Sequence, residues 1–180
     1  MAGDGQCKPC ETVNEWKLLR ENYRLYRFLT ELEDILKDSI DEANCLPKIR
    51  LLVRQFITNS YWLQTQEPEP CEQTGTSVTL LYDELGFPLT VQTVKFMPGV
   101  ISTIHNHGTW GVIAILKGQE KNTFWKRSSD PKNKYKIERV GEKILQSGDL
   151  ISLTSDAIHS VEVVGAVSYT HLTLPTSYAV

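Results

Sequence analysis

The spacing of hydrophobic residues changes about one third of the way along the chain, from a helical period to a strand period. Between Trp16 and Leu36, apolar side chains recur at steps of three and four, apart from one final step of one, which predicts one amphipathic helix or two shorter ones. A second stripe between Leu46 and Ile57 predicts another helix, with Pro47 near its first turn. We interpret both stripes as core-packing faces rather than as a ligand groove. The stripe residues are Trp16, Leu19, Tyr23, Tyr26, Leu29, Leu32, Ile35 and Leu36 in the first, and Leu46, Ile49, Leu52, Val53, Phe56 and Ile57 in the second.

Beyond the segment Glu67-Pro68-Glu69-Pro70, which disfavours helix, short apolar runs are separated by turn residues. Many short strands joined by Gly, Pro and Asp predict an all-β sandwich or barrel. Strands are expected over residues 78–82, 89–96, 110–116, 123–125, 135–140, 150–153 and 160–164, with turns at Met97-Pro98-Gly99, at Gly141-Glu142 and at Gln146-Ser147-Gly148-Asp149.

The last stretch, residues 167–180, contains no Asp, Glu, Lys or Arg. It resembles translated adapter or vector sequence, and we interpret it as a non-native ending that packs poorly where a closing strand would lie; Tyr169 and His171 then carry no function. The alternative is a genuine last strand. The expected organisation is therefore a helical segment over 12–66, a β-barrel over 73–166 and this atypical tail, all within one structural domain.

Composition narrows the classes of function. A length of 180 residues suits one domain with one core, and a charged fraction of 23% with a net charge of −3 does not favour nucleic acid or an anionic membrane surface as a partner. No apolar run approaches the ~20 residues that span a bilayer, and the N-terminus has no apolar signal segment, so we expect a cytoplasmic protein. Cys7 and Cys10 have the spacing of half a zinc site or of a redox pair, but a second pair is missing, and we interpret them as incidental thiols.

Three histidines carry the candidate chemistry. Residues i and i+2 of a strand share a face, so His105 and His107 point together while Asn106 points away. Two imidazoles on one face can hold a metal ion through bonds of about 2.0–2.1 Å. His159, about 50 residues further on beside another apolar strand, is the candidate third ligand.

The spacing of these histidines and of three glycines resembles the two sequence motifs of the cupin superfamily. Gly148 and His159 fit the second motif, whereas Gly111 stands where the first motif has a glutamate ligand. The resemblance implies a double-stranded β-helix, a jelly-roll barrel, with the N-terminal α-helices packed on it. The first motif is matched by Gly99, His105, His107 and Gly118, and in the second motif Thr154, Asp156 and Val163 replace the usual Pro, Gly and Asn.

A three-histidine site without the glutamate resembles the thiol dioxygenases within the cupins, namely cysteine dioxygenase and the bacterial 3-mercaptopropionate dioxygenase type. This implies Fe(II) held by His105, His107 and His159, with a small thiol and O2 as partners and a sulfinate as product, in a monomer or homodimer. The chemistry agrees, because three neutral imidazoles leave a ferrous ion its full charge and favour a soft, anionic thiolate.

Some features of that family are missing. Val112 occupies the position of a cross-linked cysteine, and residues 77–82 lack the arginine that holds a substrate carboxylate in those enzymes. The tail replaces a Ser-x-His-x-Tyr run, so no catalytic or substrate-binding residue is assigned. Two alternatives stay open: another metal cupin, such as an isomerase or a His₃ zinc hydrolase, and a non-catalytic cupin that binds a small ligand.

Overall fold

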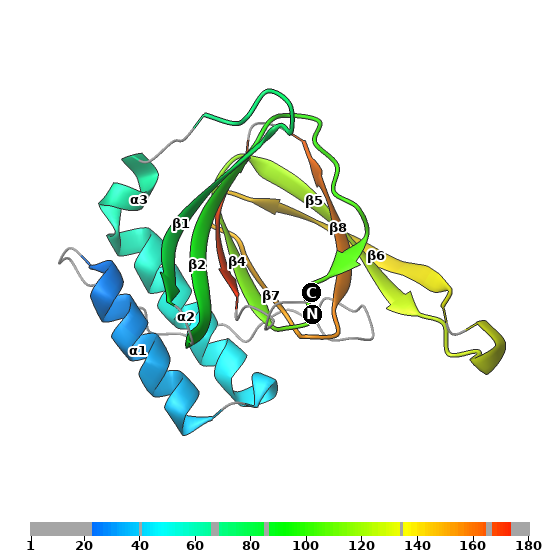
Figure 1. Ribbon diagram of the computed structural model, residues 1–180, viewed down its shortest axis with the longest axis horizontal. Helices are drawn as coiled ribbons and strands as arrows, with labels where there is room; N and C mark the ends of the chain where they lie inside the picture. The colour runs from blue at the N-terminus through cyan, green and yellow to red at the C-terminus, as the bar shows by residue number, and fades with distance from the viewer. Residues whose placement is uncertain are drawn as a thin grey trace.

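The structure is a computed structural model that describes residues 23–39, 41–65, 69–84, 87–133, 135–164 and 167–173. Helices come first and strands follow, and the helices cover one side of the β-structure (Figure 1). The helices are α1 (Leu25–Asp38), α2 (Glu42–Asn59) and α3 (Tyr61–Thr65), with a 3-10 turn at Pro131–Asn133. The strands are β1 (Thr76–Glu84), β2 (Phe87–Phe96), β3 (His105–Asn106), β4 (Gly111–Lys117), β5 (Gln119–Arg127), β6 (Ile137–Gln146), β7 (Leu150–Leu153), β8 (Ile158–Val163) and β9 (Val167–Thr173).

The strands form two antiparallel sheets. Sheet A has the order β1-β2-β9-β4-β7 and sheet B the order β3-β8-β5-β6. From β3 to β9 the chain passes from one sheet to the other at every connection except the β5–β6 hairpin, which is the arrangement of a jelly roll. The predicted fold class, mainly β with N-terminal helices packed on a barrel, is therefore confirmed. None of the helices in the described ranges is both long and apolar enough to cross a bilayer.

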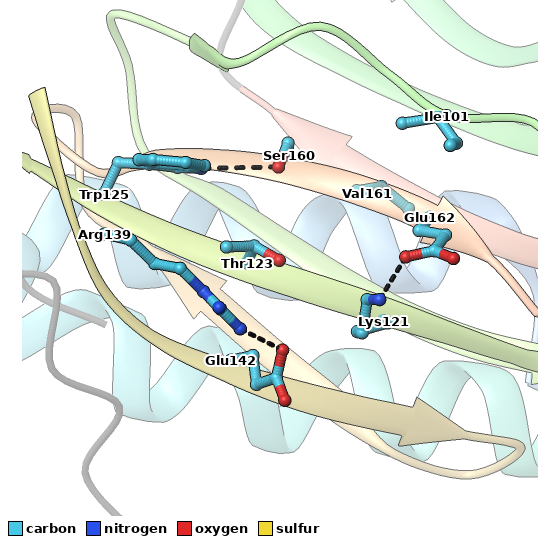
Figure 2. A pocket seen from close by; sticks show the side chains of 9 residues that line it. All are labelled: Ile101, Lys121, Thr123, Trp125, Arg139, Glu142, Ser160, Val161 and Glu162. Atoms are coloured by element: carbon cyan, nitrogen blue, oxygen red, sulfur yellow. Dashed lines mark hydrogen bonds and ion pairs between the residues drawn. The ribbon is translucent and has the colours of Figure 1, made fainter.

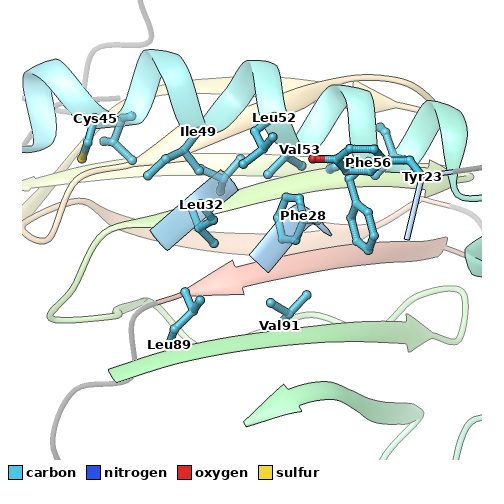
Figure 3. Close-up of a cluster of buried hydrophobic side chains, with 14 of the residues drawn as sticks. Tyr23, Phe28, Leu32, Cys45, Ile49, Leu52, Val53, Phe56, Leu89 and Val91 are labelled. Atoms are coloured by element: carbon cyan, nitrogen blue, oxygen red, sulfur yellow. The ribbon is translucent and has the colours of Figure 1, made fainter. Parts of the chain in front are cut away.

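Alternation along the strands creates two hydrophobic cores. Along β4, Ile113 and Ile115 face the barrel interior together with Phe124, whereas Val112 and Ala114 face the helices. Figure 3 shows the helix-facing cluster, in which Leu89 and Val91 of β2 point toward α1 and α2. The barrel core comprises Val94, Ile113, Ile115, Phe124, Leu145, Ile151, Leu153, Ala157 and Val163.

The second predicted stripe is the buried face of α2, and most of the described part of the first stripe packs against it, which confirms the packing interpretation. Tyr26 of the first stripe was wrong, because it is 72% exposed, and Phe28 is buried instead. Phe28 of α1 stacks on Phe56 of α2, with ring centroids 4.3 Å apart. The place of Pro47 was also wrong: α2 begins at Glu42, so Pro47 lies in the second turn rather than the first. A proline there removes one backbone donor, and the buried stripe on either side compensates for that loss. The first residues of the predicted stripe, before Tyr23, lie outside the described residues.

The predicted turn at Gly141-Glu142 is wrong as well. Strand β6 runs straight through it, and the pairing with β5 slips by one residue because Phe124 pairs with Gly141 while Trp125 pairs with Arg139. An extra residue on one strand of an antiparallel pair is a β-bulge, and a glycine in a strand often marks one. The glycine therefore bends the strand instead of ending it.

The first half of the tail lies in the predicted place and forms a strand. Residues 167–173 form β9, which pairs with β2 on one side and with β4 on the other, in the place expected for the closing strand. The backbone thus completes sheet A rather than leaving an open edge there. Residues 174–180 lie outside the described residues, and the non-native origin of the tail stays a prediction.

Candidate metal centre

The three predicted histidines lie together. His105 of β3 pairs directly with His159 of β8 in the ladder of sheet B, and His107 follows β3 by one residue. One ligand nitrogen from each ring lies within 4.8 Å of the other two. Among the described residues, no other set of three or more His, Cys, Asp or Glu side chains converges in this way. The predicted Cys7 and Cys10 pair lies outside the described residues.

The geometry of the cluster fits a metal ion. Bonds of about 2.1 Å to one ion place neighbouring ligand atoms roughly 3.0–3.4 Å apart. The Nε2 atoms of His107 and His159 are 3.1 Å apart, within that range. His159 is 1% exposed and His105 and His107 are half-buried, so the cluster lies at the mouth of the barrel interior with one side toward solvent.

Hydrogen bonds at the other ring nitrogens fix the tautomers of two of the histidines. Nδ1 of His105 lies 2.9 Å from the carbonyl oxygen of Thr103, and Nδ1 of His159 lies 2.9 Å from Oδ1 of Asn122. Both partners are acceptors, so each Nδ1 donates its proton and each Nε2 keeps its lone pair. A second hydrogen bond of this kind is what orients a metal-ligating imidazole.

The imidazole of His107 is neutral at pH 7. Burial first, and the neighbouring His105 second, lower the pKa of His107 to about 4. A neutral imidazole has a lone pair to offer, whereas an imidazolium has none. Protons therefore compete weakly with a metal ion for this nitrogen at physiological pH.

Two residues of β5 that the sequence analysis missed extend the site inward. Asn122 donates from Nδ2 to Oε1 of Glu120 over 2.7 Å, and both side chains are 0% exposed. The second carboxyl oxygen of Glu120 has no hydrogen-bond partner, and burial raises the pKa of this group. The sequence did offer one sign of their position: both residues alternate in phase with Phe124 along the strand, so they face inward despite their polarity.

The position of Gly111 supports its assignment at the missing glutamate. Gly111 is buried at the start of β4 and has the same phase as Ile113 and Ile115, so it borders the barrel interior. Val112, by contrast, belongs to the helix-facing cluster. A cysteine at position 112 would therefore face the helices and not the histidines.

A separate groove lies on the outer face of sheet B (Figure 2). It has a volume of about 290 Å³, and its charged groups pair with one another as Lys121–Glu162 and Arg139–Glu142. Trp125 donates from Nε1 to Oγ of Ser160 over 3.3 Å. The groove is on the opposite side of β5 and β8 from His159 and Asn122, so it is distinct from the histidine cluster.

No protein-family model matches this sequence. Solved structures that are similar include a cupin superfamily protein from Desulfitobacterium hafniense, with 14% identity, a TM-score of 0.47 and coverage of 63% of this chain and 87% of that one. An oxalate oxidase shows 17% identity, a TM-score of 0.46 and coverage of 62% and 56% respectively. KdgF from Halomonas sp. shows 14% identity, a TM-score of 0.45 and coverage of 62% and 89%. The strand order and the candidate site define a class of protein: a jelly-roll barrel with a three-histidine cluster able to hold a metal ion.

Proposed function

We propose that this protein is an Fe(II)-dependent thiol dioxygenase that oxidises a small thiol, of the cysteine or 3-mercaptopropionate type, to its sulfinate. The observation that carries the proposal is the composition of the cluster, which contains three imidazoles and no carboxylate. Gly111 stands at the position where a glutamate would complete a four-ligand site.

The absence of a carboxylate from this cluster sets its charge preference. Three neutral ligands leave a divalent ion with two positive charges, which favours anionic ligands in the remaining positions. Fe(II) held by His105, His107 and His159 would supply Lewis acidity and redox chemistry toward a thiolate and O2. A thiolate is soft and anionic, so it matches both the metal and the charge.

The overall reaction balances without a further reductant. The thiolate sulfur gives up four electrons to O2, and both oxygen atoms end on that sulfur: RS⁻ + O2 → RSO2⁻. The role of the chain is to hold the three imidazoles in one orientation, through Thr103 at His105 and Asn122 at His159. Phe124 and the barrel core behind it exclude water from the inner side of the cluster.

The charge of the barrel interior bears on the choice of thiol. The buried polar side chains among the described residues include no Lys or Arg. A thiol that carries a carboxylate therefore has no buried cation to pair with in this part of the chain. For that reason the test compares thiols with different second groups.

The test is an oxygen-electrode screen of iron-loaded protein with cysteine, 3-mercaptopropionate and cysteamine. We expect one thiol to cause O2 uptake with one sulfinate formed per O2, measured by mass spectrometry, and His159→Ala to abolish it. Iron retention without uptake for any thiol would favour another metal cupin. Failure to retain any metal after anaerobic loading would favour a non-catalytic small-ligand-binding barrel, and either result would overturn the proposal.

A further inference from the structure

We propose that Glu120, acting through Asn122, determines which ring nitrogen of His159 carries the proton and so keeps the other nitrogen available at the cluster. The inference rests on the proposed function only in taking His159 as a metal ligand. Glu120 is then a positioning residue, because it touches neither a metal ion nor a substrate.

The three side chains form a continuous row inside sheet B. Glu120 and Asn122 are two residues apart on β5 and share a face, and Asn122 reaches diagonally across the ladder to His159 on β8. The row contains two hydrogen bonds, of 2.7 Å from Asn122 to Glu120 and of 2.9 Å between Asn122 and His159. All three side chains are at most 1% exposed, so water cannot substitute for a missing partner.

The argument turns on the symmetry of an amide group. An asparagine side chain presents a donor on one side and an acceptor on the other, and a rotation of 180° exchanges them. With Oδ1 toward His159, the imidazole must carry its proton on Nδ1, which leaves the Nε2 lone pair facing His107. With Nδ2 toward His159, the proton would move to Nε2 and block the ligand position.

Glu120 selects between these two orientations. In its ionised form the Glu120 carboxylate can only accept hydrogen bonds, so it requires the amide donor of Asn122 to face it. Oε2 makes no hydrogen bond at all, so the carboxyl is directed at Asn122 alone. Leaving a buried oxygen unpaired is unfavourable for folding, and a role in the site explains why such a group stands here in place of an apolar one.

The direct test is the tautomer of His159, measured in the metal-free protein by ¹⁵N–¹H correlation of the imidazole nitrogens. We expect Nδ1–H in the wild type. In Glu120→Gln we expect a weaker preference for Nδ1–H, because the new amide can turn either its carbonyl oxygen or its NH2 group toward Asn122. In Glu120→Leu we expect a mixture of Nδ1–H and Nε2–H. Retention of pure Nδ1–H in Glu120→Leu would overturn the proposal.

Binding of Co(II) alone provides a second measurement that needs no thiol and no turnover. Loss of an outer-shell partner typically weakens metal binding about tenfold to a hundredfold. We expect that loss in Glu120→Leu and a smaller loss in Glu120→Gln, which still offers Asn122 a hydrogen-bond partner. Thr93→Val is the matched control, because the Thr93 hydroxyl is also buried without a partner but lies on sheet A; it should bind Co(II) as the wild type does. An equal loss in Thr93→Val and Glu120→Leu would mean that general destabilisation, and not this row, lowers affinity.

A double-mutant cycle shows whether Glu120 acts through Asn122. In Asn122→Asp the new carboxylate accepts from His159 in either orientation, and a protonated Glu120 can donate to it. The effect of Glu120→Leu on the tautomer should therefore vanish in the Asn122→Asp background. If the effect persists there, the proposed route through Asn122 is wrong. A wild-type protein that binds no Co(II) would defeat the proposed function, and the tautomer measurements would still decide this inference.

Discussion

Sheets A and B face each other across the barrel core, but the two sheets differ in the kinds of side chain that their inner and outer faces carry. Sheet A is largely apolar on both sides, because its outer face packs under α1 and α2 and its inner face lines the barrel; Thr93 and Ser152 are its buried polar residues among those described (Figure 3). None of the described helices covers the outer face of sheet B, which carries paired charges (Figures 1 and 2). The inner face of sheet B carries His159, Asn122 and Glu120. The buried polar side chains of sheet B therefore face largely apolar packing on sheet A.

The largest effect is expected from the histidines of sheet B. His105→Ala, His107→Ala and His159→Ala should each lower iron content by at least tenfold, because each removes one of three protein ligands. The change in melting temperature of the metal-free protein should stay small for the half-buried His105. Iron content after anaerobic loading and gel filtration provides the measurement. Full iron content in His159→Ala would contradict the three-ligand arrangement.

The next effect concerns the helix cover of sheet A. Phe56 is 0% exposed and contacts Tyr23, Phe28 and Trp62 through ring packing. Phe56→Ala should lower the free energy of unfolding by about 3–5 kcal/mol, measured by urea denaturation of the metal-free protein. Tyr26→Ala on α1, at a side chain that is 72% exposed, is the control and should change it by less than about 0.5 kcal/mol. Similar losses in the two variants would mean that the helices are not packed as described.

A substitution on sheet A, where β4 borders the barrel interior, sharpens the comparison. Gly111 starts β4 and borders the barrel interior, so Gly111→Glu should place a carboxylate beside the histidines. We expect metal to stay bound and thiol oxidation to fall by at least about tenfold, since the carboxylate lowers the positive charge and occupies a position that the substrate needs. Gly111→Ala separates the effect of the carboxylate from that of the added side chain. Unchanged turnover in Gly111→Glu would show that residue 111 does not border the metal.

The free energy of unfolding of the metal-free protein should depend on pH through the depressed pKa of the His107 imidazole. The pKa of His107 is about 4 in the folded protein against an ordinary 6.5. Above pH 6.5 the group is neutral in both states, whereas between pH 6.5 and 4 the unfolded chain binds a proton that the native state rejects, so stability falls as the pH falls. In the metal-free protein, His107→Gln should flatten this part of the profile. Parallel profiles for variant and wild type would contradict the depressed pKa.

The smallest effect concerns the least usual strand of sheet A. Val112 of β4 pairs with Leu172 of β9, so the two backbones share a ladder. Because the tail lacks the alternation and charge of a typical closing strand, we expect amides of residues 168–173 to exchange faster than those of residues 112–116. Hydrogen exchange followed by mass spectrometry measures the difference. Equal protection would mean that β9 is a genuine barrel strand and that the non-native interpretation of the tail is wrong.

Much of the architecture follows from local pattern. The amphipathic stripes of α1 and α2, the strand at Leu150–Leu153 and the turn that contains Gly148 were predictable, because period and turn chemistry act over a few residues. The gathering of His105, His107 and His159 was predictable from motif spacing alone. The direct pairing of His105 on β3 with His159 on β8 was not predictable, because it depends on the register of strands far apart in the sequence.

The errors have physical causes. Gly141 looks like a turn residue, but pairing with β5 on one side holds the strand together around a bulge. Glu120 and Asn122 were missed because polar residues in an alternating strand are normally read as solvent-facing, and here they bond to each other inside the barrel. The bond from Asn122 to His159 depends on the register of β5 against β8, which the local pattern does not reveal.

The position of β9 has a consequence for how the barrel assembles. The segment that leaves the ribosome last among the described strands is inserted between two strands made much earlier, β2 and β4. Until it arrives, sheet A exists as two separate ribbons, β1-β2 and β4-β7, each with an edge able to pair with another chain. Contacts so distant in sequence also slow the search for the native state. Nascent chains of this protein therefore pass through an interval in which association with one another competes with closure, and a chaperone that shields strand edges during synthesis would act at that interval.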